Sequence, residues 1–151
     1  NSKLERFFYL VNEKTTFQIN QIFRQLSKEK RNNPIQINIK GRVFVITSFF
    51  DGLARFNFLD LCAVNLGAED YITIAEICNF ITIDKIPNFK YNNSDQQKRF
   101  ITLIDVIYEK KVYLAISGTS SLQEITSSNS LLETFKRTLS RLYELTSNKH
   151  H

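Results

Sequence analysis

The segment from Gln96 to Gly118 constrains the fold most, because its apolar residues follow first one period and then another. Its first part repeats apolar side chains at helical spacing, at Phe100, Leu103, Ile104 and Ile107. After a charged break at residues 109–111, the run from Val112 to Ile116 is apolar without interruption, which is typical of a strand covered on both faces. A helix that leads into a fully buried strand forms half of a βαβ unit. The segment therefore predicts an α/β fold.

A second buried strand is predicted upstream of this segment. Phe80–Ile83 is apolar and rich in β-branched residues, and Asp84–Pro87 closes it because proline cannot continue a strand ladder. Such βαβ units normally bind ligands beyond the carboxyl ends of their strands. Ser117, at the end of the second strand, is therefore a candidate polar contact to a ligand. The alternative is that Ser117 is a simple turn residue.

The N-terminal residues predict a strand and a helix. Phe7–Val11 is a short apolar stretch, and we expect its pairing partner to lie outside this chain. Thr15 or Thr16 can cap a helix whose basic last turn is Lys28–Arg31, where the helix dipole favours cations.

Two turns predict short antiparallel strands in the next part of the chain. Residues 35–46 form a hairpin that turns at Lys40-Gly41-Arg42, and Asp51-Gly52 precedes a third short strand. Leu59–Cys62 then predicts a single helical turn, and a helix ending near Asn79 follows, with Asp70 near its N-terminus.

The C-terminal third predicts one irregular segment and one helix. Ser120–Asn129 is rich in serine and threonine, so we expect a mobile surface connection. A helix over about Ser130–Ser147 is expected to bury Leu131, Leu132, Phe135, Leu139 and Leu142.

Composition places the chain among globular proteins and argues against a zinc site. Of its 151 residues, 42% are hydrophobic and 23% are charged, which is not a disordered composition. Cys62 and Cys78 lack CxxC spacing and are expected to be buried, and the only histidines are His150 and His151, which are either native or a tag remnant. The chain contains no methionine, so we expect it to be a piece of a longer protein.

The formal net charge of +5 is unevenly distributed but does not form a basic stripe. Residues 1–42 hold nine basic and three acidic side chains, whereas residues 43–89 hold two basic and six acidic ones. Acidic residues alternate with basic ones elsewhere, which argues against a nucleic-acid partner. Nucleic-acid binding through the basic segment Arg24–Arg42 stays an alternative. Arg55 with Phe56 and Phe58 could stack on bases, although alternating aromatics on a strand more often belong to the core.

Three charged residues near the C-terminus have two interpretations each. Arg137 and Arg141 lie four residues apart on one helix face and could reach a nucleotide phosphate. Alternatively they form ordinary surface ion pairs, with Glu133 and Glu144. Asp105 lies among apolar residues and needs a basic partner. We expect that partner to be Arg99 or Arg42, in a structural rather than a catalytic role, because no histidine or second carboxylate accompanies Asp105.

Several short motifs in a fixed order resemble the C-terminal portion of the ZapE-like P-loop ATPases, a family that includes the mitochondrial AFG-one-like (lactation-elevated) ATPases. The matching stretches lie between about residues 35 and 147. They are Gly41-Arg42, Ala54-Arg55-Phe56-Asn57-Phe58, Leu61-Cys62, Leu66-Gly67-Ala68, Asp70-Tyr71, Ile86-Pro87, Arg99–Asp105, Tyr108, Ser117, Phe135, Arg137-Thr138, Ser140-Arg141-Leu142 and Glu144.

The resemblance implies an AAA+-like P-loop ATPase that uses ATP and Mg²⁺ in cell division or in protein quality control at an inner membrane. The chain itself lacks the phosphate-binding motif GxxxxGK[ST], since its four glycines, at positions 41, 52, 67 and 118, form no such loop. It also lacks an apolar strand that ends in paired acids. We therefore expect the ATP site in an upstream core of the parent protein. For the isolated chain we expect no bound ATP or metal, no catalytic residue and no activity.

The resemblance also predicts how the chain is organised. Residues 1–34 would continue the absent ATPase core, residues 35–147 would form a C-terminal α/β domain with a mixed sheet and flanking helices, and residues 148–151 would be a tail. The expected partners are the upstream core and either a protein partner or a second copy of the chain, with peripheral membrane contact. The expected location is the cytoplasm of a bacterium, or the mitochondrial matrix of a eukaryote. The alternative is a stand-alone protein-interaction module without catalysis.

Overall fold

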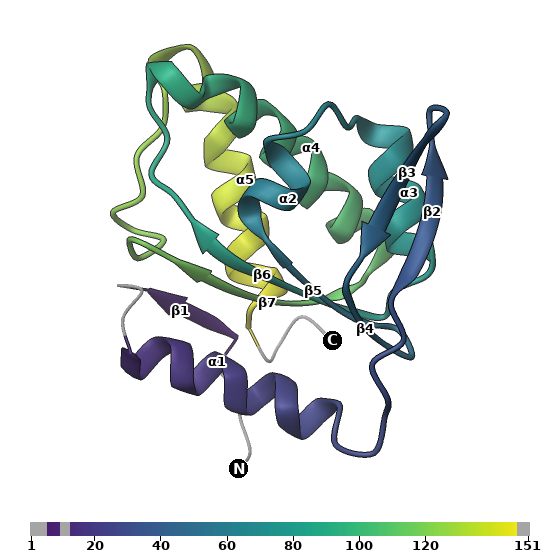
Figure 1. Cartoon of the computed structure of the whole chain (residues 1–151). Coiled ribbons are helices and arrows are strands. Elements are labelled where there is room, and N and C mark those ends of the chain that lie inside the picture. Colours follow the sequence, from purple (N-terminus) through teal and green to yellow (C-terminus); the bar gives the residue numbers. More distant parts are fainter. Residues whose placement is uncertain (1–5, 10–12, 148–151) are drawn as a thin grey trace.

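A computed structural model describes residues 6–9 and 13–147 of the chain (Figure 1). In chain order its elements are β1 (Phe7–Tyr9), α1 (Glu13–Leu26), β2 (Ile35–Ile39), β3 (Arg42–Ile46), β4 (Ser48–Phe50), β5 (Leu53–Asn57), α2 (Phe58–Cys62), α3 (Ala68–Glu76), β6 (Phe80–Ile86), η1 (Tyr91–Asn93), α4 (Ser94–Lys110), β7 (Tyr113–Gly118), η2 (Asn129–Leu131) and α5 (Leu132–Leu145). The α/β class and the buried strand–helix–strand unit, β6–α4–β7, are confirmed.

Five strands form one mixed sheet in the order β1-β7-β6-β5-β4. The first four are parallel to one another, and β4 runs antiparallel to β5. The expectation that the first strand pairs outside this chain is wrong, because β1 pairs with β7, with Phe7 opposite Ile116. The described residues before position 35 thus belong to the same sheet and its cover, while the proposed domain boundary at residue 34 stays a prediction.

Both predicted turns are present and connect antiparallel strands. Lys40 and Gly41 have φ angles of 53° and 76°, and Asp51 and Gly52 have φ angles of 52° and 94°. Two successive residues with positive φ are the pattern of the tight two-residue hairpin turn. The first turn joins β2 to β3 in a separate two-stranded sheet, and the second joins β4 to β5.

The two faces of the five-stranded sheet are covered by different elements (Figure 1). Helices α2 to α5 lie on one face and bury the main core, which includes Phe58, Phe89, Phe100 and both cysteines. Helix α1 lies on the other face over a smaller apolar cluster made by Phe23, Leu53, Phe80 and Ala115. The buried position expected for Cys62 and Cys78 is confirmed.

Helix α1 differs from its prediction in where it ends, and α5 differs in which residues it buries. Helix α1 stops at Leu26, so the basic residues 28–31 follow the helix instead of forming its last turn. In α5 the buried positions include Thr138 and Leu145, whereas Leu132, which was expected in the core, is 46% exposed. The stripe of α5 is thus rotated relative to the predicted one, because it follows the line along which α5 packs against α4.

The serine- and threonine-rich segment between β7 and α5 is irregular, but it is anchored rather than loose. Gln97 of α4 is fully buried, and its amide donates to Ser127 Oγ at 2.7 Å. The Gln97 side-chain oxygen accepts hydrogen bonds from the Ser128 amide and hydroxyl at 3.1 and 3.0 Å. Thr126 Oγ1 donates to the carbonyl of Phe89 at 2.9 Å. This replaces the expectation of a mobile connection.

No helix within the described residues is long and apolar enough to cross a bilayer.

Candidate functional site

The sheet face beneath α1 changes from apolar to polar along the strands. Because side chains alternate along a strand, every second residue of β5, β6 and β7 lies on this face. The amino ends supply Leu53 and Phe80, which lie opposite each other. The carboxyl ends supply Asn57 and Asp84, again opposite each other. A polar edge on an otherwise buried sheet marks the end at which parallel α/β sheets bind ligands.

A pocket of about 200 Å³ lies at this carboxyl edge, between the strand ends and the first turns of α1. Its lining residues come from α1, β5, β6 and β7, and they are Thr15, Thr16, Ile19, Arg55, Asn57, Asp84, Lys85 and Ser117. Ser117 therefore lies in a pocket at the strand ends. Whether it contacts a ligand there stays a prediction.

A hydrogen-bonded chain of polar groups organises one wall of the pocket. Arg55 Nε donates to Asp84 Oδ2 at 2.7 Å, and Ser117 Oγ donates to Asp84 Oδ1 at 3.2 Å. The backbone N–H of Lys85 donates to Ser117 Oγ at 2.9 Å. The Arg55 and Asp84 side chains are 21% and 13% exposed. Both carboxylate oxygens are thus satisfied by donors, as a mostly buried charge requires.

An irregularity in β6 shapes the same wall. The pairing of β6 with β7 shifts register between Ile83 and Ile86, and Lys85 has a φ angle of 65°. Such a bulge changes where side chains at the strand end are directed, and it commonly occurs next to binding sites. A positive φ is uncommon for lysine and is typically retained where the surrounding structure imposes it. The sequence prediction ended this strand at Ile83 and so missed the bulge.

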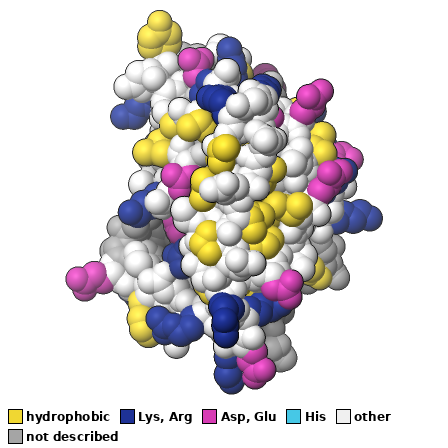
Figure 2. All heavy atoms as spheres, turned by 45° about the vertical axis from the view of Figure 1, so that its right-hand side comes forward, with side chains coloured by type: hydrophobic (Ala, Val, Ile, Leu, Met, Phe, Trp, Pro, Cys, Tyr) yellow, Lys and Arg dark blue, Asp and Glu magenta, His cyan; other side chains and the backbone are white. Residues whose placement is uncertain are grey.

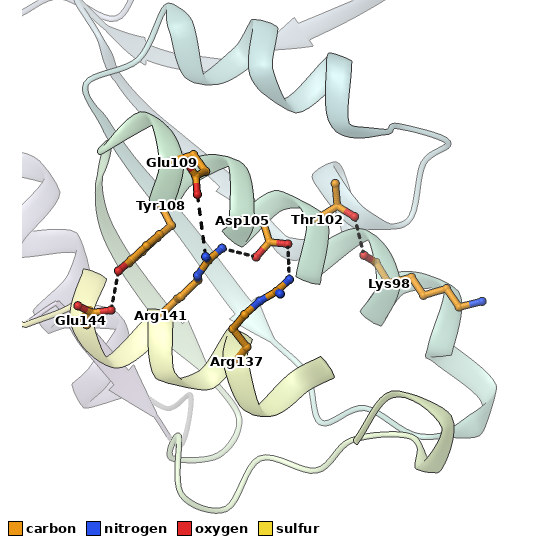
Figure 3. Close-up of polar contacts among 8 residues, drawn as sticks. All are labelled: Lys98, Thr102, Asp105, Tyr108, Glu109, Arg137, Arg141 and Glu144. Atoms are coloured by element: carbon orange, nitrogen blue, oxygen red, sulfur yellow. Dashed lines mark hydrogen bonds and ion pairs between the residues drawn. The ribbon is translucent and has the colours of Figure 1, made fainter. Parts of the chain in front are cut away.

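Arg137 and Arg141 do not line this pocket. Both lie on α5 and bind Asp105 of α4, at 3.2 and 2.8 Å from its two carboxylate oxygens (Figure 3). The Arg141 guanidinium also lies 4.4 Å from the ring centroid of Tyr108, whose hydroxyl donates to Glu144 at 2.8 Å. We call this α4–α5 group the helix cluster. Both arginines that were proposed to bind phosphate are thus used in contacts between two helices.

The partners predicted for these charged residues are wrong in detail. Asp105 pairs with arginine as expected, but Arg99 donates instead to the carbonyl of Cys62 at 3.0 Å. Arg42 likewise donates to the carbonyl of Asn65 at 3.2 Å.

The predicted pairs within α5 differ from the observed ones as well. Glu133 pairs with Lys136 at 3.0 Å, not with Arg137. Glu144 accepts a hydrogen bond from Tyr108, whereas Arg141 pairs with Asp105. Partner choice here follows the packing of α4 on α5, which sequence spacing along one helix does not reveal.

Comparisons with known proteins give the chain a family. The sequence model of the AFG1-like ATPases matches residues 2–151. The chain belongs to the AFG1-like ATPase family. Cell division protein ZapE of Escherichia coli K12 is 26% identical over 140 residues, which are 93% of this chain and 37% of that protein. Lactation elevated protein 1 homolog B of Danio rerio is 28% identical over 123 residues, 80% of this chain and 24% of that protein.

The chain therefore spans between about a quarter and two fifths of these curated relatives. No solved structure matches it significantly. Membership of the AFG1-like family agrees with the α/β fold and with the family expected from the sequence motifs.

The AFG1-like family implies ATP and Mg²⁺, and the residues of the pocket do not fit that pair. Ligand pockets for drug-sized molecules usually measure about 300–1,000 Å³, whereas this pocket measures about 200 Å³. Magnesium with a nucleotide is held by carboxylates together with the phosphates. Asp84, the one carboxylate among the pocket-lining residues that the structure describes, already accepts hydrogen bonds from Arg55 and Ser117. No step of ATP chemistry is derived from this pocket.

The sequence prediction missed Arg55 and Asp84 as site residues of this AFG1-like chain. The interpretation of Phe56 and Phe58 as core residues is confirmed, because both are buried on the α2–α5 face. Arg55 precedes Phe56 in β5 and lies on the opposite face of the sheet, whereas Phe58 begins α2. The signal that could have found the site is Asp84, a lone acid directly after a buried apolar run, at the strand end where ligands bind.

Proposed function

We propose that this chain is the C-terminal part of an AFG1-like ATPase that binds and hydrolyses ATP with Mg²⁺ in a separate upstream core. The observation on which the proposal depends is the family match over residues 2–151 of a chain that has no GxxxxGK[ST] motif. The pocket at the sheet edge is too small for a whole nucleotide, so it is not proposed as that site. In this proposal the isolated chain is catalytically inactive, and Arg137 and Arg141 hold α4 and α5 together.

The whole protein would act in cell division, or in protein quality control at an inner membrane. The first role is supported by similarity to ZapE, a cell division protein. The corresponding location is the bacterial cytoplasm. Within the parent, this part would form contacts with the ATPase core, with a protein partner or with a second copy of the chain.

One exposed apolar surface supports a contact role. Val43 and Val45 of β3 are 61% and 45% exposed, and neighbouring Val64 is 39% exposed. Hydrophobic side chains gather among polar ones on the side of the molecule that Figure 2 shows. Apolar surface that stays exposed in one part of a protein often becomes buried in an interface. The same surface would serve the alternative function, a stand-alone interaction module.

Titration with a fluorescent ATP analogue tests where the nucleotide site lies. The isolated chain should show no saturable binding that depends on Mg²⁺, because it lacks the backbone loop and the lysine that hold phosphates. Micromolar binding that disappears when Mg²⁺ is chelated would overturn the proposal.

The coding DNA upstream of Asn1 separates the two functions. An in-frame P-loop there supports the ATPase parent. Its absence supports the interaction module.

A further inference from the structure

The pocket at the carboxyl edge of the sheet has unused cationic groups. Arg55 donates its Nε proton to Asp84, and within the described residues its two terminal nitrogens have no hydrogen-bond acceptor. Lys85 is exposed and lines the same pocket, and no described carboxylate lies within ion-pair distance of its Nζ. The formal charges of the lining residues, two positive and one negative, leave an excess of one positive charge.

The arginine is held in an orientation that suits recognition of an anion. Asp84 fixes the Nε of Arg55, and the ring of Phe23 lies 5.5 Å below the guanidinium carbon. A guanidinium fixed in this way loses little side-chain entropy when it binds. Its planar fork of N–H donors matches the oxygens of phosphate and carboxylate groups.

The remaining lining groups favour a small anion over a metal ion. Among the described residues that line the pocket, Asp84 is the only carboxylate, and Arg55 and Ser117 already donate to both its oxygens. The side chains of Thr16 and Asn57 add neutral hydrogen-bond donors at the pocket wall. A volume of about 200 Å³ accepts a single anionic group more readily than a whole nucleotide.

We propose that this pocket binds one anionic oxygen group, a phosphate or a carboxylate, with Arg55 and Lys85 as its cationic partners. Arg55 donates to two oxygens of the anion, and Lys85 adds a second positive charge from the bulge in β6. Asp84 and Ser117 position Arg55 and do not contact the anion directly. The inference does not depend on the location of the ATP site.

The test is a titration of the 151-residue chain followed by amide NMR shifts. Sodium phosphate and, separately, sodium acetate are added at constant ionic strength, with sodium chloride as the reference salt. Saturable shifts of the amides of Thr16, Lys85 and Ser117 with either anion are the expected result. The anion that binds more tightly identifies the phosphate or carboxylate class. Shifts scattered over the surface, or equal to those in chloride, overturn the proposal.

Two variants and a matched control connect binding to the named side chains. Lys85→Asn removes one charge at an exposed position and tolerates positive φ. It should weaken binding by about tenfold, the usual effect of losing one charged hydrogen bond. Arg55→Lys keeps the charge but removes the fork, so it should weaken binding by a similar factor. Lys98→Ala removes a charge from the exposed surface of α4, outside the pocket, and should leave affinity unchanged.

The outcomes of the variants are decisive even if one of them folds poorly. If Lys85→Asn binds phosphate and acetate as tightly as Lys98→Ala does, the pocket is not the binding site and the proposal fails. If ATP binds as weakly as free phosphate and without Mg²⁺, the pocket proposal is supported and the upstream ATP site is unaffected.

Discussion

The two faces of the five-stranded sheet differ in polarity and in the helices that cover them. The face beneath α2–α5 is apolar along the whole length of its strands and is covered by four helices. The face beneath α1 is apolar only at the amino ends of the strands, and at the carboxyl ends it presents Arg55, Asp84 and Ser117 to a pocket.

The difference shows where this fold has room for binding. Four helices cover one face, whereas the other face is covered by one helix of 14 residues, beside which a pocket lies at the strand ends. Where cover is incomplete, polar side chains can be half-buried, paired with each other and still accessible to a ligand. The helix cluster of Asp105, Arg137 and Arg141 is also made of arginine and carboxylate, but it lies on the outer side of the covering helices and closes on itself.

The largest loss of stability should come from removing a large buried side chain on the α2–α5 face. Phe100 is fully buried, with its ring centroid 5.7 Å from that of Phe58 and 5.6 Å from that of Phe89. Phe100→Ala should lower the free energy of unfolding by about 4 kcal/mol, because a cavity adds to the lost burial. Phe23→Ala, on the α1 face, should cost about 2 kcal/mol, since its cluster is small. Urea unfolding measures both, and equal losses would remove the distinction between the faces.

The second-largest loss of stability should come from alkaline pH, which acts on the two thiols buried on the α2–α5 face. Burial raises the pKa of the Cys62 and Cys78 thiols to about 12, from 9.0. Unfolded thiols lose their protons first as pH rises, so stability is intact below pH 9 and falls between about pH 9 and 12. At pH 10 the two thiols together should remove about 2–3 kcal/mol.

The matched variant for the alkaline effect is Cys62→Ala with Cys78→Ala. Urea unfolding at pH 8 and pH 10 should show a clearly smaller difference in this variant than in the unaltered chain. An undiminished difference would mean that other groups, such as Tyr71, whose pKa burial also raises, are responsible for the loss.

Removing the Arg55–Asp84 ion pair on the α1 face should cause an intermediate loss of stability. Asp84→Ala leaves the Arg55 guanidinium and the Ser117 hydroxyl without their acceptor. We expect a loss of about 2 kcal/mol, less than for a fully buried pair because Arg55 is partly exposed. Glu76→Ala, which removes an exposed pair with Lys110, is the control and should cost about 0.5 kcal/mol or less. If the two variants lost similar free energies of unfolding, the Asp84 ion pair would stabilise the chain no more than an ordinary surface pair does.

Removing the ion pairs of the helix cluster should cause the smallest loss of stability, and this loss should depend most strongly on salt. Asp105→Ala removes the acceptor of both Arg137 and Arg141, and we expect a loss of about 1 kcal/mol at low salt. In 0.5 M NaCl the loss should shrink, because Arg137 is 58% exposed and its pair with Asp105 is screened, whereas the Asp84→Ala loss should change little. A double-mutant cycle between Asp105 and Arg141 measures the coupling directly. Equal salt dependence at the two sites would show that they differ less than their burial indicates.

Much of the fold could be predicted from local patterns in the sequence. The change of period between Gln96 and Gly118 predicted a helix and a buried strand, and the structure has α4 and β7 there. The turns at Lys40-Gly41 and Asp51-Gly52 also depend only on neighbouring residues. Such features are local in sequence, so one sequence suffices to find them.

The candidate site could be predicted only in part. Ser117 was found because it ends a recognisable strand, but Arg55 and Asp84 are 29 residues apart and meet through the register of β5 with β6. Asp105 likewise meets Arg141 across 36 residues of sequence. Neither contact could be predicted from the periodicity of the sequence, because each joins residues that are far apart along the chain.

The α/β class, the strand–helix–strand unit and the family could be predicted without a structure, because periodicity and ordered motifs are properties of the chain. The folded chain was needed to show which charges pair, which strand lies beside β1 and where the pocket lies. Those outcomes depend on strand register and helix packing, which bring together residues that no local pattern connects. The segment of α4 and β7 is accordingly the most predictable part of the chain, yet the sequence did not reveal that its Asp105 binds Arg141 or that its Ser117 binds Asp84.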